Sequence, residues 1–336
     1  MDKIAQALVA AGRGILAADE SNGTIKKRFD SIKVESTEEN RRAYREMLFT
    51  AKGAEAAISG VILYDETLRQ SAADGRPFAK VLSDLGIVPG IKVDKGAKSL
   101  AGCPGETVTE GLDGLRERCQ EYHKLGARFA KWRAVIDIAG DGVPTDTCIR
   151  TNAHALARYA AICQETGLVP IVEPEVLMDG AHDIARCAVV TEQALNALYD
   201  ELRLQRVRLE ATLLKPNMVI SGKKCAKQAG VDEVAARTLE VLKRCVPAAV
   251  PGIVFLSGGQ SDLLATKHLD AMNKLDGALP WKLSFSYGRA LQAAALQAWG
   301  GKASNVAAGQ AAFLLRARAN GAAALGKWSA AMEKAA

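Results

Sequence analysis

The sequence has few aromatic residues and few histidines, and it has no long apolar run. Aromatic residues make up 5% of the 336 residues, and there are 4 histidines. The histidines are far apart and show neither HxxH nor HxxxH spacing, which is unlike the clustered ligands of a zinc enzyme; they are His123, His154, His182 and His268. Nowhere is there an uncharged apolar stretch of about 18 residues, and the N-terminal segment has no small-residue cleavage site. We therefore expect a soluble, cytoplasmic protein with no membrane partner.

Three further patterns are missing. The 7 cysteines are scattered without a CxxC pair, so we expect reduced thiols that mostly serve in packing. The net charge of +6 is spread among interleaved acidic and basic residues, which gives little support to a nucleic-acid partner. A mild positive excess would suit an anionic small substrate, but solvated helix surfaces explain it equally well. No GxGxxG lies between a strand and a helix, which argues against a Rossmann-type dehydrogenase.

What the sequence does contain is material for a large core, since 49% of its residues are hydrophobic. Short runs rich in β-branched or apolar residues recur along the chain and predict buried strands. The eight runs are GILAAD from Gly14, GVILYD from Gly60, GIKVD from Gly90, FAKWRAVI from Phe129, VPIVEPEV from Val169, LEATLLKPNMV from Leu209, GIVFLSGG from Gly252 and KLSFSYG from Lys282.

Segments with helical periodicity separate these runs and have recognisable ends. Ser36 and Glu39 have the spacing of a capping box ahead of a long helical pattern. Other expected helix ends are the N-terminal caps Asp232 and Ser261 and the C-terminal glycines Gly126 and Gly167.

The alternation predicts an α/β protein. Successive strand starts are separated by roughly 30 to 46 residues, which suits a strand, a loop and one or two crossover helices. A doubly wound open sheet would explain the alternation equally well, but the count of eight favours a (β/α)₈ TIM barrel. Because no Pro/Gly/Ser-rich linker interrupts the series, we expect a single domain over residues 1–336 with a short C-terminal tail from about residue 322.

Charged residues occur where a buried barrel strand should be apolar. Lys131 and Arg133 lie two apart, as do Glu173 and Glu175, and a period of two puts each pair on one face of its strand. Each pair could be a structural ion pair, or a strand could be misplaced. The same pattern in five strands argues against both alternatives, because buried charges are costly unless they are paired. Further charges near the C-terminal ends of strands, where barrel active sites form, are Asp19, Glu20, Asp94, Lys95 and Lys215.

Lysines and carboxylates together indicate chemistry on a carbonyl group. A lysine amine is almost wholly protonated at neutral pH, and burial with a neighbouring cation favours the neutral form that can attack. Lys131 can be that neighbouring cation for Lys215. Glu173 can then shuttle protons during loss of water from a carbinolamine, and Asp19 can act as a second base.

A possible phosphate site follows the seventh run. Ser257, Gly258 and Gly259 end that run with backbone N–H groups that can hold an anion. An SGG sequence alone is more often a tight turn. Arg289, at the end of the eighth run, can add a bidentate contact and strengthens the hypothesis.

Together these motifs resemble the class I fructose-1,6-bisphosphate aldolases. The resemblance runs from about residue 12 to about residue 321, and the motifs occur in the family's order. They are ILAADES, DGRPF, GIKVDKG, LDGLRERC, FAKWR, IVEPE, LLKPNMV, FLSGGQS, FSYGRALQ and AWGG.

The resemblance implies a role for each matching residue. Lys215 would form a Schiff base with C2 of the ketose, and Glu173 would be the general acid and base for that step. Asp19 would help to remove the C4 hydroxyl proton, with Lys131, supported by Glu175, stabilising charge there. The C1 phosphate would contact Ser257, Gly258 and Arg289. Contacts to the rest of the substrate and its C6 phosphate would come from Lys95, Ser21, Thr24 and Arg133.

The resemblance also implies the overall activity. Fructose 1,6-bisphosphate would be cleaved reversibly to dihydroxyacetone phosphate and glyceraldehyde 3-phosphate, in glycolysis and gluconeogenesis, by a homotetramer without a cofactor or metal. Animal members carry a terminal tyrosine that assists proton transfer, whereas the last tyrosine here is Tyr287. Preference for sedoheptulose 1,7-bisphosphate or fructose 1-phosphate therefore stays open, as does a non-catalytic scaffold role on the same barrel.

Overall fold

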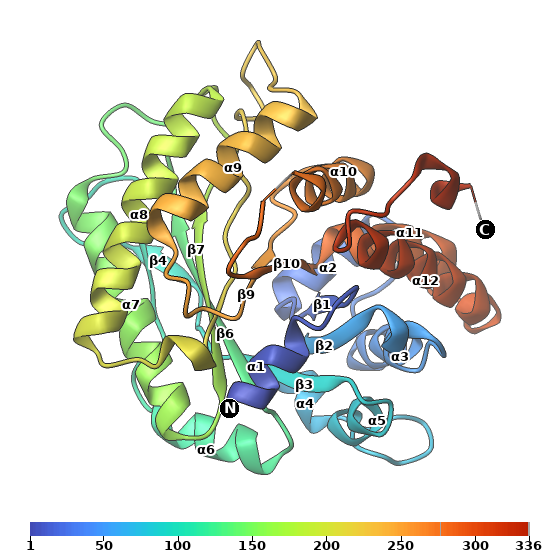
Figure 1. Cartoon of the computed structure of the whole chain (residues 1–336). Coiled ribbons are helices and arrows are strands. Elements are labelled where there is room, and N and C mark those ends of the chain that lie inside the picture. Colours follow the sequence, from blue (N-terminus) through green and yellow to red (C-terminus); the bar gives the residue numbers. More distant parts are fainter. Residues whose placement is uncertain (276, 335–336) are drawn as a thin grey trace.

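The computed structural model describes residues 1–275 and 277–334, and its centre is a closed barrel of eight parallel strands (Figure 1). The strands follow each other around the barrel in the order β1-β10-β9-β8-β7-β6-β3-β2. This confirms the predicted (β/α)₈ fold, and each of the eight apolar runs supplies one strand. Their bounds are β1 Gly14–Ala18, β2 Ile58–Leu63, β3 Val88–Lys92, β6 Phe129–Ile136, β7 Val169–Val176, β8 Leu213–Leu214, β9 Gly252–Phe255 and β10 Lys282–Tyr287.

The strands differ in length around the barrel. β6 and β7 pair over eight residues, from Phe129 opposite Val169 to Ile136 opposite Val176. β8 is much shorter than the run expected from Leu209, because Leu209–Ala211 form a 3₁₀ turn (η2) and Pro216 has no N–H to continue a ladder. Lys215 still donates its backbone N–H to Val172 at 2.8 Å, so it prolongs the line of β8.

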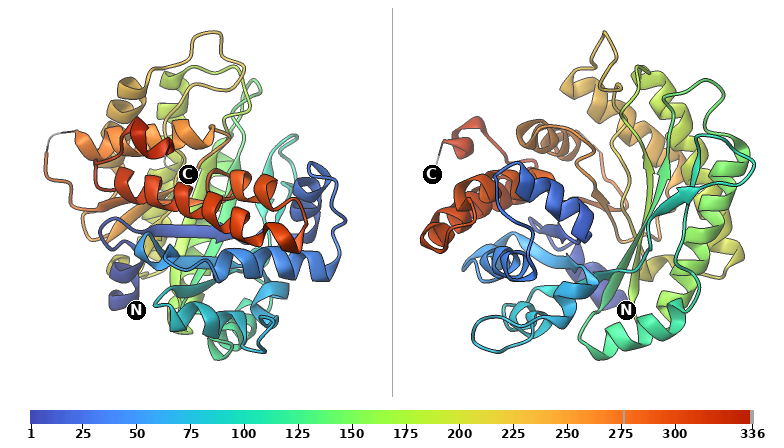
Figure 2. Two further views of the ribbon diagram at one scale, coloured as in Figure 1. Left: turned by 90° about the vertical axis from the view of Figure 1, so that its right-hand side faces the viewer. Right: turned by 180° about the vertical axis from the view of Figure 1, so that it is seen from behind.

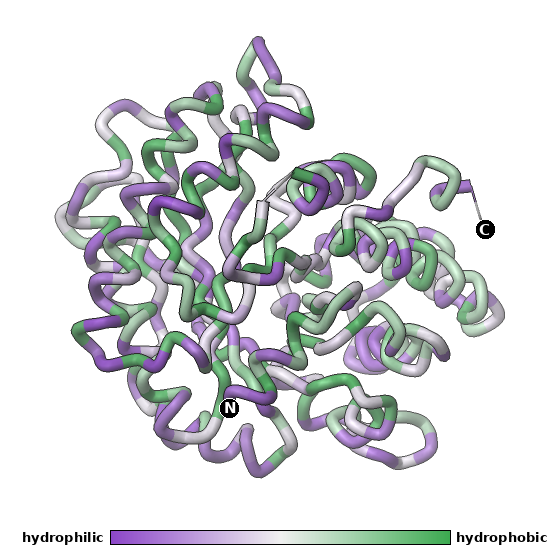
Figure 3. The backbone as a smooth tube through the Cα atoms, in the orientation of Figure 1, coloured by the Kyte–Doolittle hydropathy of each residue, from purple (hydrophilic) through white to green (hydrophobic). Residues whose placement is uncertain are grey.

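Helices surround the barrel and separate it from solvent (Figure 2). Hydrophilic and hydrophobic residues alternate along these helices, as expected for helices with one buried side (Figure 3). The helices are α1 Asp2–Leu8, α2 Asn22–Asp30, α3 Glu38–Phe49, α4 Asp65–Arg69, α5 Phe78–Asp84, α6 Leu115–Lys124, α7 Asp146–Glu165, α8 Ile184–Leu204, α9 Val231–Cys245, α10 Asp262–Lys274, α11 Arg289–Trp299 and α12 Val306–Ala323.

The predicted helix ends were partly right. Ser261 caps α10 by accepting the N–H of Leu264, and both C-terminal glycines have positive φ after their helices. The capping box was misplaced by one residue, because Thr37, not Ser36, accepts the N–H of Asn40. The cap at Asp232 was also wrong. Helix α9 begins at Val231 after Gly230, which leaves Asp232 in the first turn, where its charge still favours the helix dipole.

The floor of the barrel is closed by the N-terminal helix. Leu8 and Val9 belong to one buried apolar cluster with inward-facing strand residues such as Phe129 and Ile171. The start of β3 must approach this cluster without a side chain, because a Cβ on Gly90 would lie 2.2 Å from the ring of Phe129. The end of the barrel opposite to the strands' C-terminal ends is therefore packed solid with side chains.

A small sheet and several short turns lie outside the barrel strands and their helices. A two-stranded antiparallel sheet that the sequence did not suggest joins β4 (Ala97–Ser99) and β5 (Thr107–Thr109). Three short 3₁₀ turns lie outside the barrel: η1 Ala54–Ala56, η3 Ala303–Asn305 and η4 Ala330–Glu333. Of the tail expected from about residue 322, residues 335 and 336 lie outside the described part. Within the residues that are described, no helix is long and apolar enough to cross a membrane.

Candidate active site

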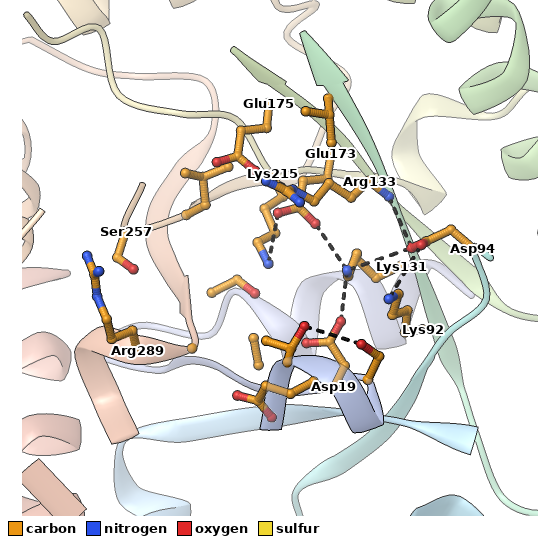
Figure 4. A pocket seen from close by; sticks show the side chains of 18 of the residues that line it. Asp19, Lys92, Asp94, Lys131, Arg133, Glu173, Glu175, Lys215, Ser257 and Arg289 are labelled. Carbon is orange, nitrogen blue, oxygen red and sulfur yellow. Dashed lines mark hydrogen bonds and ion pairs between the residues drawn. The ribbon is translucent and has the colours of Figure 1, made fainter. Parts of the chain in front are cut away.

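A polar hollow of about 510 Å³ opens at the C-terminal ends of the barrel strands. Its walls carry Asp19 after β1, Lys131 on β6, Glu173 on β7 and Lys215 after β8. Figure 4 shows these side chains converging from different strands on the middle of the hollow. The charges that interrupted separate apolar runs in the sequence therefore share one site.

The centre of the hollow is a chain of lysines and carboxylates. The two oxygens of Glu173 face two different amines: Oε1 lies 3.2 Å from Nζ of Lys215, and Oε2 lies 3.5 Å from Nζ of Lys131. Nζ of Lys131 in turn lies 2.8 Å from Oδ2 of Asp19. Lys131, Glu173 and Lys215 are each less than 5% exposed. A proton can therefore pass between the carboxylate of Glu173 and the amine of Lys215.

The electrostatics fix the ionisation of two members of this chain. Burial opposes the ionisation of Asp19, but attraction to Lys131 and Lys215 outweighs it and holds the pKa of Asp19 below its usual value. Burial likewise disfavours the charged form of Lys131. Asp19, Glu173 and Asp94 overcome that effect and raise the pKa of Lys131. At neutral pH the site therefore holds a permanent ammonium next to a permanent carboxylate.

A second layer of charge surrounds this centre. Arg133 pairs with Glu175, and attraction to Glu175 overcomes burial and raises the pKa of Arg133. Asp94 lies between two lysines, with Oδ1 3.5 Å from Nζ of Lys92 and Oδ2 3.9 Å from Nζ of Lys131. The pairs hold the central side chains in place and compensate their charge.

One side of the hollow has the features of an anion site. Figure 4 shows Ser257 and Arg289 together on this side, away from Lys92 and Asp94. Gly258 and Gly259 follow β9 with φ angles of 42° and 73°. Successive backbone N–H groups in a tight turn can form a concave anion site. Within residues 1–275 and 277–334, the N–H groups of these two glycines have no protein acceptor, so they are available to a ligand.

The other side of the hollow is lined by residues of the first and third units. Ser21 and Thr24 lie at the start of α2, with Ser21 Oγ 3.2 Å from Thr24 Oγ1, and Arg28 follows one turn later. Lys92 completes this side. Lys95, which the sequence suggested for this role, instead lies on the exposed side of the loop after β3 and lines a neighbouring depression.

The comparisons with known proteins agree with this geometry. The family model described as fructose-bisphosphate aldolase class-I matches residues 1–336. This chain belongs to the class I fructose-bisphosphate aldolases. An aldolase of Xanthomonas campestris, named a probable fructose-bisphosphate aldolase class 1, is 62% identical over 96% of this chain and 97% of its own length. A cytosolic fructose-bisphosphate aldolase of Arabidopsis thaliana is 58% identical over 97% of this chain and 91% of its own.

A solved aldolase structure confirms the fold. The fructose-bisphosphate aldolase of Plasmodium falciparum, crystallised with TRAP and a small-molecule inhibitor, superposes with a TM-score of 0.96 at 52% identity. The match covers 98% of this chain and 94% of that one. The resemblance inferred from the sequence motifs is therefore confirmed, and this aldolase is a member of a family of carbon–carbon lyases that bind phosphorylated sugars.

Sequence reasoning missed two basic residues that line the hollow of this aldolase. Lys92 lies inside the apolar run GIKVD and was not singled out from the sequence. Its spacing of two from Asp94 could have indicated that both side chains face the hollow. Lys95 has the opposite parity and points away. Arg28 lies on a helix, where no strand periodicity could reveal it. It reaches the hollow because it pairs with Glu20, a buried carboxylate directly after Asp19.

A metal centre has no obvious place among the described side chains. In the parts of the chain covered by the structure, no three His, Cys, Asp or Glu residues are grouped to hold an ion. The four histidines stay apart: His268 lies on the buried side of α10, and His154 lies near Glu201 on the surface. The hollow itself offers lysines, and these serve as nucleophiles or anion contacts more often than as metal ligands.

Proposed function

We propose that this chain reversibly cleaves fructose 1,6-bisphosphate into dihydroxyacetone phosphate and glyceraldehyde 3-phosphate through a Schiff base on Lys215. A buried amine 3.2 Å from the carboxylate of Glu173 is the observation that carries the proposal. Such a pair can both create the neutral amine and recover its proton. Amine attack on a carbonyl requires both steps.

The formation of the Schiff base begins with the attack of the neutral amine of Lys215 on C2. The proton that the attacking nitrogen loses passes to the carbonyl oxygen, and the resulting carbinolamine loses this oxygen as water when Glu173 supplies the proton that it first accepted from Lys215. The nitrogen lone pair forms the C=N bond, which leaves a cationic iminium. Oε1 of Glu173 faces Lys215 while Oε2 stays against the ammonium of Lys131, so Glu173 can exchange a proton with Lys215 without leaving its position.

Carbon–carbon cleavage then needs a base for the C4 hydroxyl. Asp19 is the candidate, because its carboxylate is ionised at neutral pH and lies at the rim of the same chain of charges. When the C3–C4 bond breaks, its electron pair flows to the iminium and gives an enamine, while the C4 oxygen becomes an aldehyde. Lys131 stabilises the charge on that oxygen, and the paired Arg133 and Glu175 line the same hollow.

The two phosphates would occupy opposite sides of the hollow. Ser257, Gly258, Gly259 and Arg289 would hold the C1 phosphate, and Ser21, Thr24, Arg133 and Lys92 the C6 end. Lys92 thus takes the role that the sequence suggested for Lys95. Two cationic sides separated by the amine suit a substrate with one phosphate at each end.

Trapping of the intermediate tests this proposal directly. The protein is incubated with dihydroxyacetone phosphate, reduced with borohydride and digested for mass mapping. We expect a single adduct on the peptide that contains Lys215. Label on another lysine would reassign the nucleophile, and no label with retained binding of the triose phosphate would favour a scaffold role.

Substrate preference needs a separate comparison. Fructose 1,6-bisphosphate, fructose 1-phosphate and sedoheptulose 1,7-bisphosphate share the C1 phosphate and C2 carbonyl, so they differ at the end near Ser21 and Thr24. We expect the highest kcat/KM with fructose 1,6-bisphosphate, because both sides of the hollow are then filled. A higher value with fructose 1-phosphate would remove the second phosphate contact from the proposal.

We also propose that the protein is a cytoplasmic homotetramer. The name of the Arabidopsis relative supports the location, since it is called cytosolic. The tetramer rests on the resemblance to the family. Sedimentation velocity at several protein concentrations tests the assembly, and a species with the mass of one chain of 35.6 kDa throughout would contradict it.

A further inference from the structure

The turn after β9 is contacted from behind by a buried histidine. His268 lies in the middle of α10 and is 2% exposed, and its Nδ1 lies 2.5 Å from Oε1 of Gln260. Because an amide oxygen only accepts hydrogen bonds, Nδ1 carries the hydrogen and donates it. The amide nitrogen of Gln260 points the other way, toward the sulfur of Met218 at 3.6 Å, which supports this orientation of the amide.

Burying an imidazole at this position costs more free energy than burying an apolar side chain of similar size. Burial lowers the pKa of His268 to about 4, so the ring is neutral at physiological pH. Its Nε2 has no hydrogen-bond partner among residues 1–275 and 277–334. A leucine would fill a similar volume without an unpaired buried nitrogen. The bond to Gln260 is therefore what the histidine adds at this position.

Gln260 connects this histidine to the anion site. Its backbone N–H donates to the carbonyl of Ser257 at 3.0 Å and so closes the turn that contains Gly258 and Gly259. Its own carbonyl accepts a hydrogen bond from Nη2 of Arg289 at 2.9 Å. One residue thus joins the glycine turn to the guanidinium beside it, and its side chain is held by His268. Figure 4 shows Ser257 and Arg289 side by side on this wall of the hollow.

We propose that His268 is a positioning residue for phosphate binding. By holding Gln260, it keeps the two glycine N–H groups and the guanidinium of Arg289 in one arrangement that matches a phosphate dianion. This inference rests on the proposed C1 phosphate site. It assigns a role to His268, a residue of α10 that lies behind this site and does not itself contact the substrate.

The contact can be removed with little change in volume. We expect His268→Leu to raise KM for fructose 1,6-bisphosphate, and the inhibition constant of inorganic phosphate, by roughly fivefold, the size expected for one buried hydrogen bond. The kcat should stay within about twofold, since Lys215 and Glu173 are untouched. His268→Asn places an amide N–H where Nδ1 was, so it should restore both constants. An unchanged KM in His268→Leu, with a normal melting temperature, would overturn the inference.

A second variant and a double mutant complete the test. Gln260→Met cuts the same contact from the other partner and should give the same rise, which covers the case of an unstable histidine variant. Because His268 is proposed to position Arg289 together with the glycine turn, His268→Leu should raise KM by a smaller factor in an Arg289→Ala background than in the wild type, and fully additive effects would contradict the link through Gln260. A normal KM in Arg289→Ala alone would instead refute the phosphate site itself, and this inference with it. A raised KM in Arg289→Ala beside a normal KM in His268→Leu would refute only the role of the histidine.

Discussion

At the scale of single residues, the two lysines at the centre of the hollow have different surroundings. Lys131 lies within 3.9 Å of the carboxylates of Asp19, Glu173 and Asp94, and these hold it as an ammonium. For Lys215, the described residues offer one carboxylate within ion-pair distance, that of Glu173. The same side chain can therefore serve as a fixed cation at one position and as a nucleophile at the other.

The proposed role of Lys215 as the nucleophile can be tested by truncating its side chain. We expect Lys215→Ala to lower kcat for cleavage of fructose 1,6-bisphosphate by roughly 10⁴-fold or more, because among the described residues the other amine that faces Glu173 is Lys131, which its carboxylates hold as an ammonium. The fold should survive, since Glu173 keeps its contact with Lys131. An aldehyde-coupled assay and a thermal melt measure the two effects. Activity near that of the wild type would rule out the assignment.

Ionisation of Asp19 should be visible in the pH dependence of stability. Its pKa is depressed in the folded state, so it contributes stability above the pKa of the unfolded chain, and this contribution is lost as the pH falls toward the folded value. We expect the difference in unfolding free energy between wild type and Asp19→Asn to be constant above about pH 5 and to shrink below it. Urea melts at several pH values measure this difference. A gap that widens on acidification would contradict the assigned shift.

At the scale of elements, the sequence predicted the strands well because buried parallel strands are continuous apolar runs. All eight runs became barrel strands, and the charged positions with a period of two, such as Lys131 with Arg133, faced one site. The predictions of element ends from the sequence were wrong where neighbouring residues offer competing turns or caps. Pro216 and a 3₁₀ turn shortened β8, and Thr37 took the cap expected from Ser36. No periodicity could reveal Arg28, which reaches the hollow from a helix.

The anion site depends on two elements that meet only in the folded barrel. Its glycine turn follows β9, and Arg289 begins α11 after β10. We expect Arg289→Ala to raise KM for phosphorylated ketoses by roughly ten- to hundredfold, since hydrogen bonds to charged groups are stronger than neutral ones. Steady-state kinetics with fructose 1,6-bisphosphate and fructose 1-phosphate measure the change. An equal KM for both proteins would remove this arginine from the site.

At the scale of the whole molecule, the chemistry is spread over strands from both ends of the sequence. Asp19 and Lys215 are almost two hundred residues apart, and closure of the barrel brings them to one hollow. Such a site can use charged side chains in place of a metal, because its two central lysines are each compensated by a carboxylate from a different strand, Lys131 by Asp19 and Lys215 by Glu173.

The absence of a metal requirement is a prediction for the intact protein. We expect EDTA to leave kcat and KM for fructose 1,6-bisphosphate unchanged, because Lys215 and Glu173 can supply the proton transfers and the electron sink. Activity is measured after prolonged dialysis against the chelator, with a zinc-dependent aldolase as the positive control. Strong inhibition that zinc reverses would overturn the Schiff-base route.

The packed lower end of the barrel determines how substrate and solvent reach the hollow. With Leu8, Val9 and Phe129 filling the lower end of the barrel, nothing can pass through its axis. Solvent and substrate therefore both enter at the C-terminal ends of the strands, and a bound ketose would block this entrance. Water from the solvent could then reach the carbon–nitrogen bond on Lys215 only by passing the ketose that this bond holds in place.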